Sequence, residues 1–180
     1  MKSKTQPLRE LCTVRMGYTF REKPEFTDKG NVLVIQPRDV TPDGELSIGI
    51  SCRTQLSADM RLRKGDVLLI NRGRFTATVF DVETPLPCVA MSAFLVITST
   101  DTEQLLPQYL ATYFNSSDGQ SMFKRLTETT TIPFISLGNL ESVVIPVPSL
   151  ERQKALAAVD EMNRQYRRLC ARKVELQRRI

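Results

Sequence analysis

The organisation of this chain turns on one stretch, Ile145-Pro146-Val147-Pro148-Ser149-Leu150-Glu151-Arg152-Gln153. Its two prolines favour extended backbone and stop a helix from running backwards through them. Ser149 then offers a hydroxyl to the first free N–H groups, as a helix N-cap does. From Leu150 to Ile180 the chain contains neither glycine nor proline. We therefore predict a body over residues 1–148 and one long helix over residues 149–180.

The predicted helix carries apolar residues at alternating spacings of three and four, which places them on one face. They are Val159, Met162, Tyr166, Leu169 and Leu176, and Lys173 interrupts their stripe. Two arrangements can cover such a stripe. The helix can fold back on its own domain, or it can pair with another helix as a short coiled coil.

Composition limits the class of protein. The chain has 180 residues, of which 41% are hydrophobic, an ordinary value for a globular protein. No run approaches the roughly 18 apolar residues of a membrane span, and the N-terminus lacks the apolar run of a signal peptide. The cysteines form no C-x-x-C pair and are typical of reduced thiols in a cytoplasmic protein. They are Cys12, Cys52, Cys88 and Cys170.

The sequence argues against catalysis. Histidine is absent, which removes histidine-based triads, histidine-ligated zinc and histidine general bases. We find no glycine-rich phosphate loop and no carboxylate-x-Lys triplet of the nuclease type. Four acidic residues are scattered singly and are predicted to lie in solvated turns and at strand ends: Asp66, Asp81, Glu83 and Asp101. No metal and no cofactor is therefore expected.

The charge is unevenly distributed. Residues 150–180 hold nine Lys/Arg against four Asp/Glu, so the net charge of +5 lies on the helix and the body is neutral. Within the body the basic residues form local clusters, which favours a polyanionic partner. The clusters are Arg21/Lys23, Arg61/Arg63/Lys64, Arg72/Arg74 and Lys124/Arg125.

The body has the pattern of a mixed α+β domain, mainly β, with short strands and short helices. Strands are predicted at 32–36, 67–70, 77–82, 88–91, 94–98 and 143–147, and helices at 106–114, 118–126 and 136–140. Between two strands lies the loop Asn71-Arg72-Gly73-Arg74-Phe75-Thr76. Its donors suit phosphate and base-edge contacts, although an ordinary solvated hairpin tip would look the same.

Four segments, in the same order, resemble the specificity subunit of type I restriction–modification systems. They are Val34–Val40, Leu62–Leu68, Leu106–Leu110 and Thr130–Gln153, the last being similar to the family's T-x-(I/V) to P-x-P-x-L-x-x-Q segment. The resemblance covers nearly the whole chain. The usual subunit carries two target-recognition domains and two long spacer helices, whereas this chain has one of each and so resembles a half-subunit.

The resemblance implies a recognition subunit that performs no chemistry itself. S-adenosylmethionine and ATP would belong to the partner methyltransferase and motor subunits. The body would recognise double-stranded DNA, and the helix would act as spacer, dimerisation element and docking site for the methyltransferase. We expect a homodimer through the helix stripe, with the helix arginines outward, that recognises a bipartite palindrome. A protein–protein adaptor that binds no DNA and a small enzyme are the alternatives.

We expect one DNA-facing surface on the body, because its polar loops and basic clusters flank the predicted strands. The loop Glu128–Ile132, rich in hydroxyl groups, belongs to the same expectation. The residues are Arg21, Lys23, Gln36, Arg38, Arg72, Arg74, Thr76, Lys124, Arg125, Thr129, Thr130 and Thr131.

Overall fold

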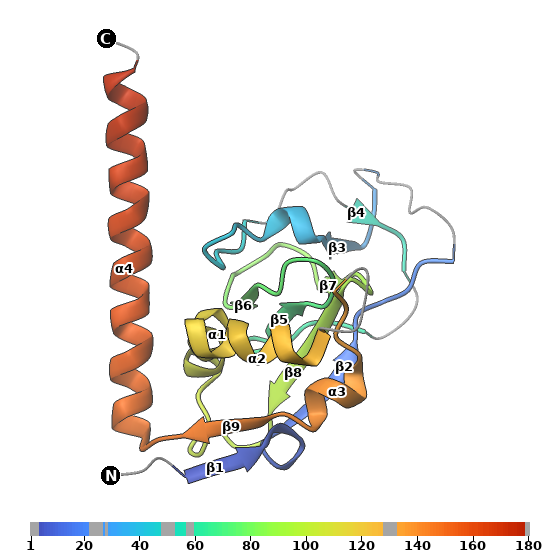
Figure 1. Cartoon of the computed structure of the whole chain (residues 1–180). Coiled ribbons are helices and arrows are strands. Elements are labelled where there is room, and N and C mark those ends of the chain that lie inside the picture. Colours follow the sequence, from blue (N-terminus) through green and yellow to red (C-terminus); the bar gives the residue numbers. More distant parts are fainter. Residues whose placement is uncertain are drawn as a thin grey trace.

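The computed structural model describes residues 4–21, 27, 29–47, 53–56, 60–127 and 133–178. A mixed α+β body is followed by one long helix, as the sequence predicts (Figure 1). The strands are β1 (Lys4–Pro7), β2 (Cys12–Met16), β3 (Val32–Ile35), β4 (Arg53–Thr54), β5 (Val67–Ile70), β6 (Ala77–Val79), β7 (Cys88–Ala90), β8 (Phe94–Ser99) and β9 (Val144–Val147). The helices are α1 (Pro107–Asn115), α2 (Ser117–Thr127), α3 (Leu137–Glu141) and α4 (Leu150–Gln177), with short 3-10 turns η1 (Leu8–Glu10) and η2 (Pro37–Asp39).

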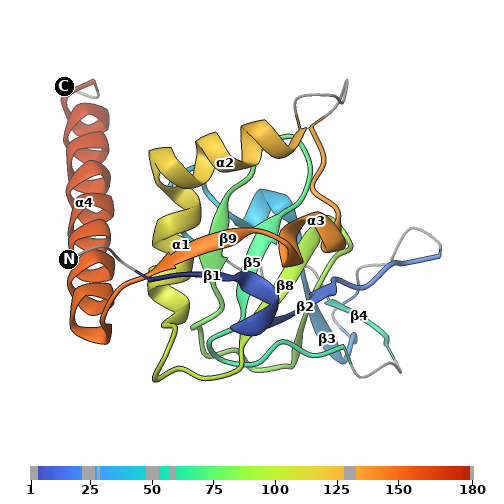
Figure 2. The same ribbon diagram turned by 60° about the horizontal axis from the view of Figure 1, so that its bottom comes forward.

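The central sheet has the order β2-β8-β5-β6, and all its neighbouring strands are antiparallel. Every residue of β5 is buried. Because successive side chains of a strand point to opposite faces, β5 supplies two cores. Val67 and Leu69 pack with the helices α1 and α2, which lie against the sheet in Figure 2. Leu68 and Ile70 pack toward β3 and β7, the parallel pair of a second sheet of order β4-β3-β7.

Most local predictions agree with the structure, with two differences. The strand predicted over 77–82 ends at Val79, so it is shorter. Ser136 caps α3 as expected, since its hydroxyl accepts a hydrogen bond from the Asn139 N–H at 3.2 Å. The predicted cap at Ser149 is wrong: its side chain makes no capping hydrogen bond, although α4 does begin at the next residue.

A two-stranded sheet leads the body into the long helix. β1 pairs antiparallel with β9, with Lys4 opposite Val147 and Pro7 opposite Val144. The N-terminal strand therefore lies at the base of α4, as Figure 1 shows. Because β9 is held on this side, the direction in which the chain enters α4 is set by the body.

The long helix packs on the body along a polar stripe, mainly against α1. Gln153 is fully buried, and Asp160 and Arg164 are half-buried. At 100° per residue these positions lie on one face, and the apolar stripe lies on the opposite one. The five stripe residues, from Val159 to Leu176, are between 50% and 69% exposed. The stripe therefore does not fold back on its own domain. Within the described ranges, no helix is both long and apolar enough to cross a membrane.

Candidate nucleic-acid interface

The loop of residues 71–76 follows β5 and is fixed from both sides. Asn71 is buried; its backbone N–H donates to Ala93 O at 3.0 Å, and its Nδ2 donates to Ser92 O at 3.2 Å. On the other side, Ile135 N–H donates to Asn71 O and Gly73 N–H donates to Pro133 O, both at 2.9 Å. Gly73 has φ +73°, a left-handed value that glycine adopts without strain. The backbone of the loop is therefore held by hydrogen bonds on both sides, unlike that of a loose hairpin tip.

The two arginines of this loop have different surroundings. The Arg72 side chain is exposed, and its guanidinium carbon lies 5.4 Å from the centroid of the Phe134 ring. Arg74 Nη2 donates to Val40 O at 2.7 Å. Arg74 therefore connects the loop to Val40, which follows η2, whereas the guanidinium of Arg72 packs over the Phe134 ring.

The contact from Arg74 brings the segment of Gln36 and Arg38 beside the loop. This segment is itself ordered by a capping box, in which Gln36 N–H donates to Asp39 Oδ2 at 2.8 Å. Arg38 is exposed and Gln36 is half-buried. The same end of the body thus presents donors from two segments that are more than 30 residues apart in sequence.

The helix α2 covers the loop from another side. Gln120 Nε2 donates to Phe75 O at 2.7 Å, and the rings of Phe75 and Phe123 lie 5.5 Å apart. Lys124 and Arg125 follow Phe123 directly and are exposed. The basic end of α2 therefore lies beside the loop that carries Arg72.

A short aromatic segment completes this end of the body. Tyr18 N–H donates to Ala90 O and Ser92 N–H donates to Tyr18 O, while the rings of Tyr18 and Phe20 pack edge to face at 4.8 Å. Arg21 follows and is exposed. Since Ser92 also accepts from Asn71, the Arg21 segment and the arginine loop share the same end of the central sheet.

The structure gathers six of the predicted contact residues around the loop and places a seventh, Arg21, at the same end of the central sheet. The gathered residues are Gln36, Arg38, Arg72, Arg74, Lys124 and Arg125. Thr76 is a correction: it is only 5% exposed, because its backbone pairs with Ile70 and turns the side chain into the domain. Lys23 and the threonines Thr129, Thr130 and Thr131 lie outside the described residues.

Asp66 is a second correction, because it is not a solvated strand-end residue. It is 1% exposed. One carboxylate oxygen accepts from Arg63 N–H at 2.9 Å and the other from the Thr98 hydroxyl at 2.6 Å, with Arg15 Nη2 at 3.9 Å. Asp66 therefore fixes the turn into β5 at the end of the sheet opposite the arginine loop. In the sequence, the position of Asp66 after Gly65 and directly before a buried strand was the feature that could have indicated this structural role.

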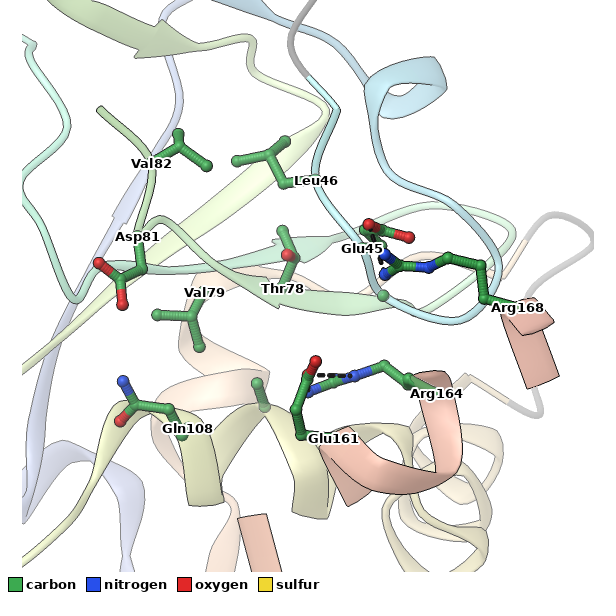
Figure 3. A pocket seen from close by; sticks show the side chains of 12 residues that line it. Glu45, Leu46, Thr78, Val79, Asp81, Val82, Gln108, Glu161, Arg164 and Arg168 are labelled. Carbon is green, nitrogen blue, oxygen red and sulfur yellow. Dashed lines mark hydrogen bonds and ion pairs between the residues drawn. The ribbon is translucent and has the colours of Figure 1, made fainter. Parts of the chain in front are cut away.

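Three helix arginines also differ from the expectation that they point outward. Arg164 pairs with Asp160 at 3.1 Å on α4 itself, an i,i+4 pair. Arg167 and Arg168 pair with Asp43 at 3.1 Å and Glu45 at 2.6 Å, acidic residues of the body. Figure 3 shows Arg164 and Arg168 beside a cavity of about 240 Å³ between α4 and the body. The pairs of Arg167 and Arg168 join α4 to the body, and both arginine side chains remain about half exposed.

Gln153 is a buried structural residue that composition and charge did not identify. Its Oε1 accepts from Leu106 N–H at 2.9 Å, and its Nε2 donates to Gln104 O and Pro148 O, each at 2.9 Å. Its side chain therefore connects the first turn of α4 with the residue after β9 and with the start of α1. The signal in the sequence was its position at the end of the P-x-P-x-L-x-x-Q segment.

Two of the described cysteines, Cys12 and Cys88, are buried thiols whose pKa values are raised. Burial raises the pKa of the Cys12 thiol to about 12, and burial also raises the pKa of Cys88. A reactive thiol needs the opposite shift. Among the described residues, no three Cys, Asp or Glu side chains come together as a metal site. The arrangement that remains is a positively charged, hydrogen-bonding end of a rigid domain.

Comparisons with known proteins agree with this arrangement. Residues 2–159 match the family model described as type I restriction modification DNA specificity domain. No curated protein sequence matches the chain.

Solved structures share the fold. One comes from a study of complex assembly and conformational transition of the type I R-M system, with TM-score 0.68 and 24% identity over 97% of this chain. The HsdS subunit from Thermoanaerobacter tengcongensis has TM-score 0.62 and 23% identity over 91% of this chain. The type I S subunit from M. genitalium has TM-score 0.64 and 18% identity over 98% of this chain.

This chain spans 43%, 37% and 42% of the lengths of those three structures, respectively. The family model, by contrast, covers most of the present chain, from the first strand of the body into the long helix. The protein therefore belongs to the family of type I restriction modification DNA specificity domains.

Proposed function

We propose that this chain recognises a short sequence in double-stranded DNA and directs the partner subunits of a type I restriction–modification system to it. The observation that carries the proposal is the gathering of exposed cations around one rigid loop, with Arg38, Arg72, Lys124 and Arg125 drawn from three separate segments. Exposed guanidinium and ammonium groups bind phosphate without regard to sequence, while a fixed arginine can also recognise a base edge.

The test is DNA binding by variants of the intact chain. Arg72→Ala combined with Lys124→Ala and Arg125→Ala removes cations from this surface. We expect weaker binding and a shallower dependence of affinity on salt, because each lost phosphate contact lowers the slope by roughly 1. Arg9→Ala is the matched control, since Arg9 is exposed in η1 at the opposite end of the central sheet. Unchanged affinity in the triple variant would contradict the proposed surface.

The proposal includes dimerisation through α4. The apolar stripe faces away from the body, and its five residues are at least half exposed. A helix face of this kind is stabilised by packing against a second helix. A copy of this chain would supply one, related by a two-fold axis. Two-fold symmetry in the protein then requires two-fold symmetry in the DNA site, so the target would be a palindrome of two half-sites with an unread spacer.

Light scattering tests the dimer. Met162→Glu together with Leu169→Glu should give a folded monomer that has lost specific binding, because buried carboxylates oppose helix pairing. Asn163→Glu is the control, since Asn163 is exposed on α4 but lies off the stripe. A monomer for the unmutated chain, at concentrations where it binds its site, would exclude self-pairing. A target with unrelated halves would indicate pairing with a different chain.

The chemistry in this proposal belongs to the partners. The chain would dock a methyltransferase subunit that uses S-adenosylmethionine and, through it, a motor subunit that uses ATP. Purified alone, it should neither methylate nor cut DNA. Product formed by a preparation free of partner subunits would refute this part of the proposal.

A further inference from the structure

The arginine loop holds its two guanidinium groups in different ways. Arg74 uses one of its donors on the Val40 carbonyl. Arg72 rests over the Phe134 ring and, among the residues that the structure describes, forms no ion pair with a carboxylate. An aromatic face attracts a cation without accepting its N–H groups in the way that an oxygen acceptor does. Arg72 is therefore held in place while its donors remain available.

Backbone hydrogen bonds hold Arg72 and Phe134 next to each other. Arg72 and Phe134 are partners in an isolated antiparallel β-bridge. The bridge consists of two hydrogen bonds, from Ile135 N–H to Asn71 O and from Gly73 N–H to Pro133 O, both at 2.9 Å. Asn71, at the root of the loop, is buried and bonded to the turn between β7 and β8. The Cα atoms of Arg72 and Phe134 therefore cannot move apart without breaking these two hydrogen bonds.

A fixed position of the guanidinium matters more for recognising a base than for contacting a phosphate. A phosphate can be reached by a flexible cation from many directions. A base edge requires the planar fork of the guanidinium at a defined position, and restricting the side chain before binding lowers the entropy lost on binding. Guanine presents two acceptors, O6 and N7, to such a fork in the major groove.

We propose that Phe134 is a positioning residue that holds Arg72 for direct recognition of a guanine within the target. The inference rests on the proposed function, because it assigns a role within the same DNA-binding surface. It distinguishes Arg72 from Lys124 and Arg125, whose contacts would be with phosphate. It also places a specificity determinant on the segment that leads into α3, where charge alone would not indicate one.

The first test needs no DNA. In the intact protein, the ring of Phe134 should shift the NMR resonances of the Arg72 side chain upfield. The shift should disappear in Phe134→Leu, which keeps an apolar side chain but removes the ring, and should persist in Phe134→Tyr. Thermal denaturation of both variants controls for folding. Absence of the shift in the unmutated chain would overturn the proposed contact.

The second test uses selection from a pool of randomised DNA duplexes. The unmutated chain should enrich one motif, and Phe134→Leu should lose preference at one G·C pair in each half-site by roughly 2- to 30-fold, the range expected for removing a cation–π contact. Arg72→Gln and Arg72→Lys should lose preference at that same pair, and Phe134→Tyr should retain it. Arg125→Gln should weaken all sequences alike.

The outcomes separate the inference from the proposed function. A motif that is unchanged in Phe134→Leu, or an Arg72→Gln variant that weakens all sequences alike, overturns the role of Phe134 and leaves DNA recognition standing. Failure of the unmutated chain to enrich any motif refutes the proposed function, and the inference with it, even if the NMR shift is present.

Discussion

Replacing Gln153 by methionine should destabilise the junction between body and helix. Methionine has nearly the same length and volume but offers no N–H donor and only a weak acceptor. The Gln153 side chain is 0% exposed and makes three hydrogen bonds, each 2.9 Å long. In the variant, the buried Pro148 O and the half-buried Leu106 N–H both lose their partner. Gln104 belongs to an exposed turn, so water can replace its bond.

The magnitude follows from these two groups, of which Pro148 O is buried and Leu106 N–H is half-buried. An unsatisfied buried donor or acceptor costs about 1–3 kcal/mol and a half-buried one less, so Gln153→Met should lower the free energy of unfolding by about 1–4 kcal/mol. That is a large fraction of the 5–15 kcal/mol by which domains are ordinarily stable, as a rough guide. Urea denaturation followed by circular dichroism measures the difference.

The control for this experiment lies on the same helix. Gln165 is exposed, and its Nε2 donates to Glu161 Oε1 at 3.0 Å. Gln165→Met should change the free energy of unfolding by no more than about 0.5 kcal/mol, as surface substitutions do. If Gln153→Met costs no more than Gln165→Met, the hydrogen bonds of Gln153 do not hold the helix to the body, and the argument fails.

Three further predictions concern the body. Asp66→Ala should destabilise the chain by about 2–4 kcal/mol in urea denaturation, because the Arg63 backbone N–H and the half-buried Thr98 hydroxyl lose a charged acceptor, whereas Asp101→Ala at an exposed turn should cost far less. Gly17→Ala should reduce the yield of folded protein, since an added Cβ would collide with the Met91 carbonyl; a melting temperature equal to that of the unmutated chain would refute this. Cys12 should resist alkylation at pH 9, measured by peptide mass spectrometry, because its pKa is raised to about 12. Since the native thiol holds its proton more tightly than an unfolded one, its contribution to stability is full below roughly pH 8.5 and declines toward pH 12.

The sequence by itself determined the local elements and the family. Prolines on either side of Val147 and a glycine-free, proline-free run placed the end of the body and the start of the long helix. Continuous apolar runs such as Val67–Ile70 predicted buried strands, and four ordered motifs indicated the specificity-subunit family. These properties depend on residues near one another in sequence, where backbone sterics and side-chain period act directly.

Only the tertiary structure decided which side chains share a surface. Arg72 and Phe134 are more than 60 residues apart, and no local pattern pairs them. Burial also reassigned Thr76 and Asp66, because whether a polar side chain faces water depends on strands contributed by distant segments. The face of α4 that contacts the body was decided in the same way: Gln153 could bury itself only where Leu106 and Pro148 offered backbone partners. An interior polar group needs hydrogen-bond partners fixed in space, and the folded chain alone supplies them.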